Sequence, residues 1–523
     1  MKKFITLFIL GITLILVSCT PAAQSNARAY VTAYTSTTMD ASFKVEVRDP
    51  DSELDSRVFN IVVTGPNGFE KVVEETIPLS QIRTISVDGL SRVTSYQVVV
   101  KGLKGGSEIE LYKKVDAFKT VAQGDVKNDP LFVSSVDDFK SMDSKKHYKL
   151  SNDIDFGNQS ITPLFGSGSP FNGSFDGDSF TLKNINITAE TDVYKSYLSL
   201  FGYASKSSIE NVKLDNVHIN NDSKPYIGIH YVGLIVSKVS NNEFKLNNIE
   251  ITNSSITVKH NINQSSTNRN LYIGLLGGSL QGIISNIVIK DSALNVTQNA
   301  VHGTYSGTDA ATAGTYIGGA VGLIEQDKGL NISKIAVMDT NIDVVVNQDK
   351  KSLGTGLVFV GGIFGAYRSD KNVTELVSNA EISFNHTKHV DTEADKKDTV
   401  YLGGLIGSIT KANASDLFFY GSIDLTASEA LNRIYTGLVV AQSAKSGSRI
   451  LSNGQLVVVT TTGTQSTVIS GVYNYDWANK LQQVKLMSSA AITIDTVISD
   501  LSGYTNVLVV SDFITSEFIN NQI

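Results

Sequence analysis

The segment Val400–Ile409, VYLGGLIGSI, decides the fold, because related segments recur along the chain. Its three glycines among large apolar residues could form a phosphate-binding loop, a helix-packing seam in a membrane, or a structural element. Eight related segments, separated by 31, 41, 44, 43, 42, 34 and 34 residues, argue against a unique phosphate loop and indicate a repeat architecture. The segment is also too short and too closely bounded by polar residues for a membrane seam. The segments centre on Gly202, Gly233, Gly274, Gly318, Gly361, Gly403, Gly437 and Gly471.

A second strand pattern follows most of these glycine segments. IENVKLDNVHI and ISNIVIKDSALNV place an asparagine near the start of an alternating apolar and polar run, and Lys334 replaces it in a later copy. No helix-length apolar period links the strands, so helical crossovers are not expected. Strands joined only by turns can coil and pair with their equivalents in the next coil. We therefore predict a parallel β-helix, in which a period near 42 residues makes about two coils.

The start of the repeat region carries a family resemblance. Tyr148–Ile187, YKLSNDIDFGNQSITPLFGSGSPFNGSFDGDSFTLKNINI, followed by SLFGYASKSSIENVKLDNVHI, resembles the opening of GLUG-repeat proteins, which are bacterial surface and secreted proteins. The resemblance covers about residues 148–459 and implies a right-handed β-helix of the pectate-lyase-like kind. It implies no activity, because the repeat occurs in non-catalytic surface proteins and also beside catalytic domains. We expect the domain to span 148–523, with the tail forming final coils and a cap.

A separate β domain is expected over residues 30–122. Segments such as ASFKVEV and RVFNIVVTG alternate with period two, and turn signals separate them, which is typical of a β-sandwich. Leu90 followed by Tyr96 resembles the tyrosine corner of fibronectin type III domains, which implies a bond between the buried phenol and the loop backbone. Because the only tryptophan is Trp477, a generic immunoglobulin-like sandwich stays open. The stretch 123–147 reads as a linker, in which SSVDDFKSM predicts a short capping helix.

The N-terminus predicts export and lipidation. Basic Lys2 and Lys3 precede an apolar run, Phe4–Val17, that is shorter than the roughly 20 residues of a membrane span, so residues 1–18 read as a signal peptide. LVSC, ending at Cys19, resembles the bacterial lipobox, which implies a diacylglyceryl group on the Cys19 sulfur and cleavage just before it. Residues 19–29 would then be a lipidated tether, with the protein held at the extracytoplasmic face or cell surface. An accidental cysteine after an ordinary signal peptide is the alternative.

Composition and motifs narrow the function classes. The net charge of −7 argues against nucleic acid as a partner. No glycine precedes a lysine, and G-x-G-x-x-G, G-x-S-x-G and H-E-x-x-H are absent, so the sequence predicts neither a nucleotide cofactor nor a familiar nucleophile or zinc motif.

Four acids are the best catalytic candidates. Paired carboxylates could perform glycosidic acid–base chemistry or bind calcium. We favour the simpler interpretation that they are turn and strand-end residues of the first coils, and we assign no catalytic residue. The four are Asp153, Asp155, Asp176 and Asp178.

Two histidines have a loose metal-ligand spacing. His386 and His389 precede Asp391 and Glu393 in a charged stretch that we expect to be a loop between coils. We therefore assign no metal site.

Polar insertions between repeats are the better functional hint, because insertions in repeat proteins often gather on a binding face. We predict a membrane-anchored bacterial surface lipoprotein, acting as a non-catalytic adhesin or recognition scaffold for an extracellular protein or glycan. The alternative is a polysaccharide lyase or glycosidase, which should align acidic or basic residues on consecutive coils; the outward Ser, Thr, Asn and Lys residues do not predict such a row. A passive coat protein is a third option. The insertions are KHNINQSSTNRN, QNAVHGTYSGTDAATAGT and HTKHVDTEADKKDT.

Overall fold

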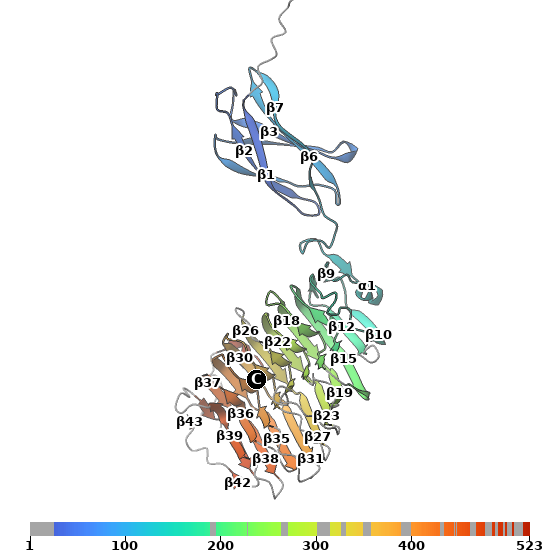
Figure 1. Ribbon diagram of the computed structural model, residues 1–523, viewed down its shortest axis with the longest axis vertical. Helices are drawn as coiled ribbons and strands as arrows, with labels where there is room; N and C mark the ends of the chain where they lie inside the picture. Colours follow the sequence, from blue (N-terminus) through green and yellow to red (C-terminus); the bar gives the residue numbers. More distant parts are fainter. Residues whose placement is uncertain are drawn as a thin grey trace, which may run out of the picture. The chain divides into compact units, whose positions relative to one another are not determined.

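The chain forms two compact units, Met1–Asp129 and Pro130–Ile523, and each is described by itself (Figure 1). Both are built almost entirely of strands, which confirms the all-β prediction. The computed structural model describes residues 26–188, 195–226, 229–262, 270–300, 314–325, 331–348, 357–388, 399–428, 433–443, 445, 447–460, 467–475, 484–486, 490–494, 497–498, 505–506 and 516–522.

The first unit consists of two antiparallel sheets that share one apolar core. The three-stranded sheet has the order β1-β2-β5 and the four-stranded sheet the order β4-β3-β6-β7. The elements are β1 (Arg28–Ser36), β2 (Ala41–Arg48), β3 (Val58–Thr64), the 3₁₀ turn η1 (Pro66–Gly68), β4 (Glu70–Thr76), β5 (Ile82–Val87), β6 (Ser95–Lys104) and β7 (Ser107–Lys119).

Tyr96 lies in this core, as its spacing from Leu90 predicted. Only 1% of Tyr96 is exposed, and its ring stacks on Phe118 with centroids 5.4 Å apart. The backbone N–H of Ser91 donates to the phenol oxygen at 2.7 Å, so the predicted bond between phenol and loop exists with the amide as donor. Gly65 packs against the same ring, where a Cβ would come within 2.5 Å of a ring carbon.

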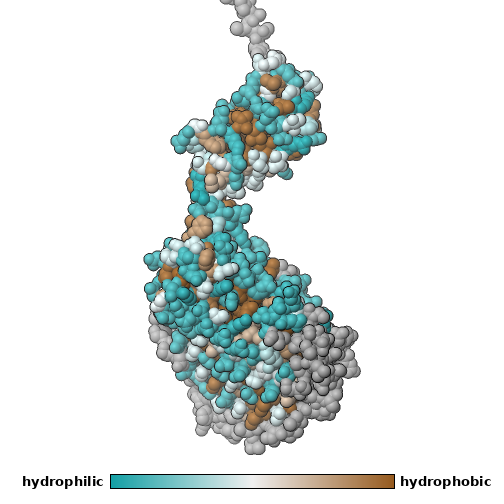
Figure 2. Space-filling view, turned by 180° about the vertical axis from the view of Figure 1, so that it is seen from behind, coloured by the Kyte–Doolittle hydropathy of each residue, from teal (hydrophilic) through white to brown (hydrophobic). Residues whose placement is uncertain are grey.

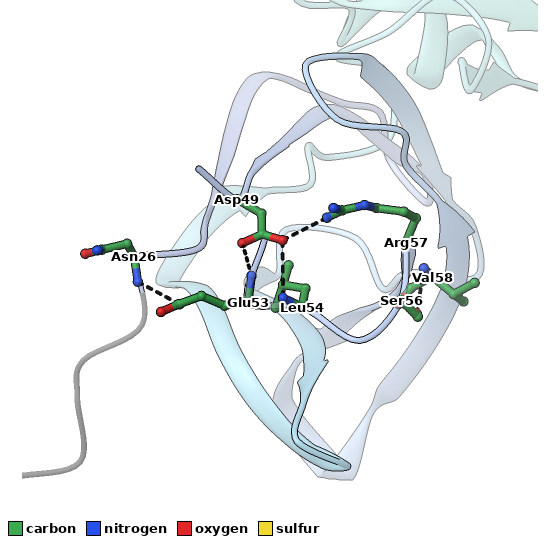
Figure 3. Close-up of polar contacts among 7 residues, drawn as sticks. All are labelled: Asn26, Asp49, Glu53, Leu54, Ser56, Arg57 and Val58. Atoms are coloured by element: carbon green, nitrogen blue, oxygen red, sulfur yellow. Dashed lines mark hydrogen bonds and ion pairs between the residues drawn. The ribbon is translucent and has the colours of Figure 1, made fainter. Parts of the chain in front are cut away.

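Asp49 closes the loop between β2 and β3 (Figure 3). Its buried carboxylate accepts from the backbone N–H of Glu53 at 2.8 Å and of Leu54 at 3.2 Å, and from the Arg57 guanidinium at 3.0 Å. Burial acts to raise the pKa of Asp49, but these three donors outweigh it and hold the pKa below its ordinary value.

The carboxylate of Asp49 should therefore stabilise the first unit in a pH-dependent way. Because its pKa is lower in the folded than in the unfolded chain, the stabilisation is complete above the ordinary pKa of about 3.9 and is lost as the pH falls below it. We expect Asp49→Ala to cost about 2 kcal/mol at pH 7 and clearly less at pH 3, measured by hydrogen exchange of the β2 and β3 amides. Asp51→Ala in the same loop, where the side chain is exposed, is the control. An equal cost at both pH values would contradict this account.

The second unit is a stack of repeats that pair in parallel. One repeat holds four strands, which we name a to d: β16 (Ile229–Val232), β17 (Val236–Val239), β18 (Lys245–Thr252) and β19 (Ser255–Ile262). Each strand hydrogen-bonds its equivalent in the next repeat. The a and b strands form a 14-stranded sheet, and the c and d strands belong to a 22-stranded sheet.

The other strands of the stack follow the same classes. The a strands are β13 (Lys195–Leu198), β20 (Leu271–Gly274), β24 (Gly314–Gly318), β28 (Leu357–Gly361), β32 (Thr399–Gly403), β36 (Arg433–Ser443, which continues as a b strand) and β39 (Thr467–Tyr475). The b strands are β14 (Tyr203–Ala204), β21 (Gly277–Leu280), β25 (Val321–Ile324), β29 (Phe364–Tyr367) and β33 (Ile406–Ile409). The c strands are β15 (Ser208–Tyr226, which continues as a d strand), β22 (Ile283–Lys290), β26 (Ile332–Met338), β30 (Val373–Ser378), β34 (Ala414–Phe419), β37 (Gly447–Ser452), β40 (Val484–Leu486) and β43 (Thr505–Asn506). The d strands are β23 (Ala293–Ala300), β27 (Asn341–Gln348), β31 (Glu381–Lys388), β35 (Ser422–Ser428), β38 (Gln455–Thr460) and β41 (Ala491–Ile494), beside the short antiparallel β42 (Val497–Ile498).

Each repeat makes one layer of the stack, so the expected two coils per repeat are wrong. Tyr231 pairs directly with Tyr272, and Tyr272 with Tyr316, one repeat further on each time. Periodicity alone cannot distinguish four strands in one layer from two layers of two strands. The hydrogen-bond register decides it.

The glycines of VYLGGLIGSI permit close packing between layers. Gly404 joins β32 to β33, and a Cβ there would lie 2.1 Å from the carbonyl oxygen of Leu438 and 2.5 Å from the Phe419 ring. A Cβ on Gly407 would meet the carbonyl oxygen of Gly365 at 2.5 Å. Any side chain at these positions would push backbone atoms apart, which confirms the structural interpretation of the segment.

One residue of each c strand from β15 to β37 has a left-handed backbone and lies beside its equivalents in the neighbouring layers. The amide of Asn248 donates to the side-chain oxygen of Asn211 at 2.8 Å, and Asn211 donates to Asp176 at 2.9 Å. Asparagine tolerates this conformation better than other residues with a Cβ, which explains the recurrent asparagine in the sequence. The row consists of Asn211, Asn248, Asn286, Lys334, Glu375, Asp416 and Arg449, with φ between 50° and 60°.

Short helices cover parts of the stack. The predicted helix is α1 (Val136–Lys140), capped by the Ser135 side chain, and its buried Phe139 packs edge-to-face on Phe156 and Phe175 of the first strands. These first strands are β8 (Leu131–Val133), β9 (His147–Leu150), β10 (Ile154–Ile161), β11 (Ser174–Asp176) and β12 (Thr181–Ile187).

The C-terminal helix lies on the outside of the stack. In α2 (Glu517–Asn520), the buried Ile519 covers an outward apolar cluster on the c strands, formed by Ala336, Met338, Val377, Phe418 and Leu451. The last strands β40, β41 and β43 extend the stack, as expected for the tail, but α2 covers its side.

Candidate functional site

The polar insertions follow strand ends that lie along one line of the stack. The described beginnings of KHNINQSSTNRN, QNAVHGTYSGTDAATAGT and HTKHVDTEADKKDT lie in d strands β19, β23 and β31, so the insertions begin later than their polarity suggested. His260 pairs with Gln298, Gln298 with Val346, and Val346 with His386, each one layer further along the stack. Because the following a strands are also in register, consecutive insertions connect equivalent points of successive layers. We call this line of the stack the insertion edge.

A polar cluster is buried inside the stack at the insertion edge. The rings of His230 and His260 touch, with centroids 5.3 Å apart, and both residues are fully buried. Ser196 Oγ lies 2.6 Å from His230 Nδ1, and Gln298 Nε2 lies 3.5 Å from His260 Nδ1. Gln298 also donates to Thr315 Oγ1 at 2.7 Å, so the contacts run through four layers. Such a network in an apolar core is held in place by its mutual hydrogen bonds.

His386 is buried in strand β31, so the expectation that it lies in a loop is wrong. Its side chain points inward, in register with Val346 and Ala427 of the neighbouring layers. The second histidine of the pair, His389, lies outside the described residues together with Asp391 and Glu393. Across the described residues, no three His, Cys, Asp or Glu side chains are grouped as metal ligands.

An aromatic row runs along the outer face of the same a strands. Neighbouring rings stack with centroids 4.7–5.5 Å apart, and from Tyr231 onward their planes lie within 7° of parallel. Tyr231, Tyr316 and Phe359 are only 4–6% exposed. The row consists of Tyr197, Tyr231, Tyr272, Tyr316, Phe359, Tyr401 and Tyr435.

The stacked rings leave their edges and hydroxyl groups for other contacts. Each interior ring face is covered by the next ring, so the row cannot stack on a sugar in the way that an open aromatic platform does. Asn270 Nδ2 donates to the Tyr272 hydroxyl at 2.9 Å, and Arg368 donates to the hydroxyl of Tyr316. Burial raises the pKa of Tyr316 despite the opposing effect of the Arg368 charge. The Tyr316 hydroxyl is therefore neutral at working pH and donates or accepts as a phenol.

A charged cluster flanks the aromatic row. Lys238 Nζ lies 3.0 Å from the Tyr231 hydroxyl, 4.4 Å from the centroid of that ring, and 3.3 Å from a Glu325 carboxylate oxygen. Ser279 also donates to Glu325. Burial acts to lower the pKa of Lys238, but Glu325 and Tyr231 outweigh it and raise the pKa, so the lysine remains charged. This pair links three layers, since Lys238 and Glu325 lie two repeats apart.

The four candidate acids serve the backbone and its turns. Asp153 accepts from the N–H of Thr181 at 2.9 Å, and Asp155 accepts from the N–H of Gly157 and from Asn184, both at 2.8 Å. The Asn184 and Gly157 donors hold the pKa of Asp155 below its ordinary value. A carboxylate in this state is a poor proton donor at neutral pH.

The other two acids, Asp176 and Asp178, have similar roles. Asp176 accepts from the N–H of Asp178 and from Asn211, both at 2.9 Å, while Asp178 lies 3.0 Å from Lys149 Nζ. These contacts agree with the turn and strand-end interpretation of all four acids.

Charged residues do align on consecutive layers, contrary to the sequence prediction. The last four members of the left-handed row, in successive layers, are Lys334, Glu375, Asp416 and Arg449. Arg449 binds Asp416 through both of its forked nitrogens, with Nε at 2.6 Å from one oxygen, and Ser516 donates to Glu375 at 2.7 Å. The two acids are therefore engaged in structural contacts. The sequence hid this row because only its first members share the asparagine.

The sequence matches no known family model and no curated protein significantly. Cys19, the predicted signal peptide and most of the tether lie outside the described residues. Neither described helix has the length and apolarity that a membrane crossing requires.

The aromatic row was missed at the sequence level, although its signal was present. The aromatic residue stands two positions before the glycine in YVG, YIG, FVG, YLG and YTG. The inward histidines also had a signal, because period two continues from Ile256 and Val258 into His260. Both patterns become significant only when equivalent positions are known to touch.

We expect the ring of Tyr316 to matter more than its hydroxyl. Phe359 occupies the equivalent position one layer on, so Tyr316→Phe should keep the stack and lose the Arg368 contact, costing about 1 kcal/mol. Tyr316→Ala removes a buried ring and should cost about 3–5 kcal/mol. Urea unfolding of the whole chain, followed by circular dichroism, measures both. Equal costs for the two variants would show that the stacked rings do not stabilise the layers.

Proposed function

We propose that this protein is a bacterial surface lipoprotein that acts as a non-catalytic adhesin or recognition scaffold. Its first unit would be a fibronectin III-like β-sandwich, a proposal supported by the three-stranded and four-stranded antiparallel sheets and by buried Tyr96. Its second unit would be a right-handed parallel β-helix, supported by parallel pairing of every repeat with the next. A lipid on Cys19 would attach the protein to the membrane.

The insertion edge carries the proposal of recognition. Polar segments of varied length and sequence connect equivalent strand ends, which are paired in register. A repeat protein that places its variable segments along one line can form an extended binding surface from them. The partner would be an extracellular protein or glycan. Hydrophilic residues predominate among the coloured residues on the face drawn in Figure 2.

The described charged groups favour recognition over catalysis. A lyase or glycosidase needs carboxylates free to exchange protons with substrate. The four candidate acids hold turns and neighbouring strands, and the aligned Asp416 is paired with Arg449. The aligned charged row is nevertheless what a polysaccharide-degrading protein would show, so this remains the second candidate. Release of reducing ends from a polysaccharide panel, lost in Asp416→Asn, would favour it.

Lipid attachment predicts a defined change on substitution of Cys19. In a bacterium expressing the whole chain, the wild type should label with a radioactive fatty acid and sediment with membranes. Cys19→Ser removes the acceptor sulfur, so labelling should vanish and the protein should appear in the soluble fraction. Ser18→Ala, next to the cysteine, is a matched control that should retain labelling. Unchanged labelling of Cys19→Ser would refute the lipid anchor.

Recognition predicts that the insertions are needed for binding while the stack is not affected by their loss. We would replace residues 302–312 and 390–397 by glycine–serine linkers and measure binding to extracellular matrix proteins and a glycan array. Binding should fall at least tenfold with unchanged circular dichroism. The control substitutes alanine for Lys213 and Glu250, an exposed ion pair on c strands. No binding by the wild type, or equal binding by the linker variants, would reject recognition through the insertion edge.

A further inference from the structure

Two inward positions of the stack carry polar side chains that the fold does not require. Gln298 and Thr315 are buried, with at most 1% of either residue exposed. One layer further on, Val346 pairs with Gln298 and Val358 pairs with Thr315, in unchanged register. An apolar side chain therefore fits at both positions in the neighbouring layer. The polar pair adds a chemical property that valine lacks, which is a hydroxyl group beside a carboxamide.

The two residues are the first and the last of the longest insertion. QNAVHGTYSGTDAATAGT runs from Gln298 to Thr315, and its two ends lie in strands β23 and β24 of successive layers. The fold thus brings together two side chains that are 17 positions apart in the sequence. A covalent bond between them would close the insertion into a ring at its base.

The Thr315 hydroxyl lies within reach of the carboxamide carbon of Gln298. Thr315 Oγ1 lies 2.7 Å from Gln298 Nε2 and 3.0 Å from Gln298 Oε1. Both amide atoms are bonded to Cδ at about 1.2–1.3 Å, so Oγ1 lies no more than about 3.3 Å from that carbon. Reacting atoms held roughly 3–3.5 Å apart in a fixed geometry react as if at very high concentration. The nucleophile and the acyl carbon are therefore at attack distance.

An imidazole faces the nitrogen that such an attack would release. His260 Nδ1 lies 3.5 Å from Gln298 Nε2, and His260 is fully buried. An amide nitrogen only donates, so the Nδ1 that receives this hydrogen bond is unprotonated and can act as a base. The ring of His230 packs against that of His260, with centroids 5.3 Å apart, and helps to position it. In acyl transfer, an imidazole takes the proton of the attacking hydroxyl and gives it to the leaving amine.

We propose that Thr315 and Gln298 form an ester cross-link that joins the two ends of the insertion. Thr315 Oγ1 attacks Cδ of Gln298, and its proton passes to His260 Nδ1. The bond between Cδ and Nε2 then breaks as His260 returns the proton to Nε2, so one molecule of ammonia leaves and the atoms balance without another reactant. The bond forms once in each molecule and needs no turnover. Because both residues are buried, water is kept from the ester and hydrolysis is slow.

The cross-link would connect two layers independently of the insertion between them. The backbone path from β23 to β24 passes through the insertion, whereas the ester joins the two strands directly. A chain cut within the insertion would then stay in one piece. The value of this protection outside the cell rests on the proposed surface location, but the chemistry does not, so the two can fail separately.

Peptide mapping of the whole chain tests the proposal. After denaturation and digestion with a protease that cuts before aspartate, peptides 291–308 and 309–326 should appear as one linked species. Its mass should be the sum of the two peptides less one ammonia, and hydroxylamine, which cleaves esters, should separate them. Two unlinked peptides of unmodified mass would overturn the proposal and leave the pair with its hydrogen bond alone.

Matched variants at position 315 separate the hydroxyl from the shape of the side chain. Thr315→Ser keeps a hydroxyl and should retain the linked species. Thr315→Val copies Val358 of the next layer, so it should abolish the linked species with an unchanged circular dichroism spectrum. A linked species in Thr315→Val would show that another residue forms the bond and would also overturn the proposal. The wild-type digest decides the link itself even where a variant fails to fold.

The role of His260 has its own variant. His260→Val copies Val346, which stands in the same row two layers further on. Without the base, formation of the linked species should slow about a hundredfold or more, followed by sampling the digest at intervals after synthesis. Formation at the wild-type rate would overturn the role of His260 as the base.

A second glutamine–threonine contact in the chain is an internal control. Gln97 Nε2 donates to Thr64 Oγ1 at 3.3 Å in the first unit, where both residues are half-buried. The first histidine of the chain is His147, so the first unit contains no imidazole. Peptides that carry Gln97 and Thr64 should therefore be unlinked. A link between them would show that contact alone suffices and would overturn the mechanism through His260.

Discussion

Parallel hydrogen bonding between equivalent strands is the constraint on which the second unit depends. Layers about 4.8 Å apart place each side chain directly against its equivalent in the next repeat. Equivalent positions of successive repeats therefore form a row of side chains along the stack. The side chains in a row must be able to pack against, or bind, their neighbours in the row. Aliphatic residues fill the inward rows, rings stack in the row from Tyr197 to Tyr435, and amides donate to amides from Asn248 to Asn211. Where the left-handed row becomes charged, Arg449 neutralises its neighbour Asp416.

The same constraint explains why the repeats differ in length. A layer requires its strands to be in register, but it places little restriction on the segment that connects a d strand to the next a strand. Spacings of 31 to 44 residues between glycine segments are therefore compatible with one unbroken stack. Differences in length and sequence between repeats therefore gather at the insertion edge, where we propose recognition. The buried polar cluster and the aromatic row lie at the same edge.

Much of the fold could be predicted from local patterns. Period-two alternation identified the strands, Ser135 and the following acids identified the short helix, and the spacing of Leu90 and Tyr96 identified a buried phenol bonded to its loop. Each of these features depends on residues that are close together in the sequence. The number of layers per repeat, the burial of His386 and the aligned charges from Lys334 to Arg449 were predicted wrongly, because each depends on partners about 40 residues away.

The sequence by itself determined that this protein is an all-β chain with repeated glycine segments, since small residues are required wherever backbones approach within about 2 to 3 Å of a potential Cβ. Only the tertiary structure decided which strands pair, and therefore which side chains become neighbours. His230 meets His260 because the a and d strands of one repeat come together at the insertion edge, and Lys238 meets Glu325 because the register between layers brings residues 87 positions apart to the same region of the stack. Local periodicity specifies the face on which a residue lies, whereas the register between layers specifies what it touches.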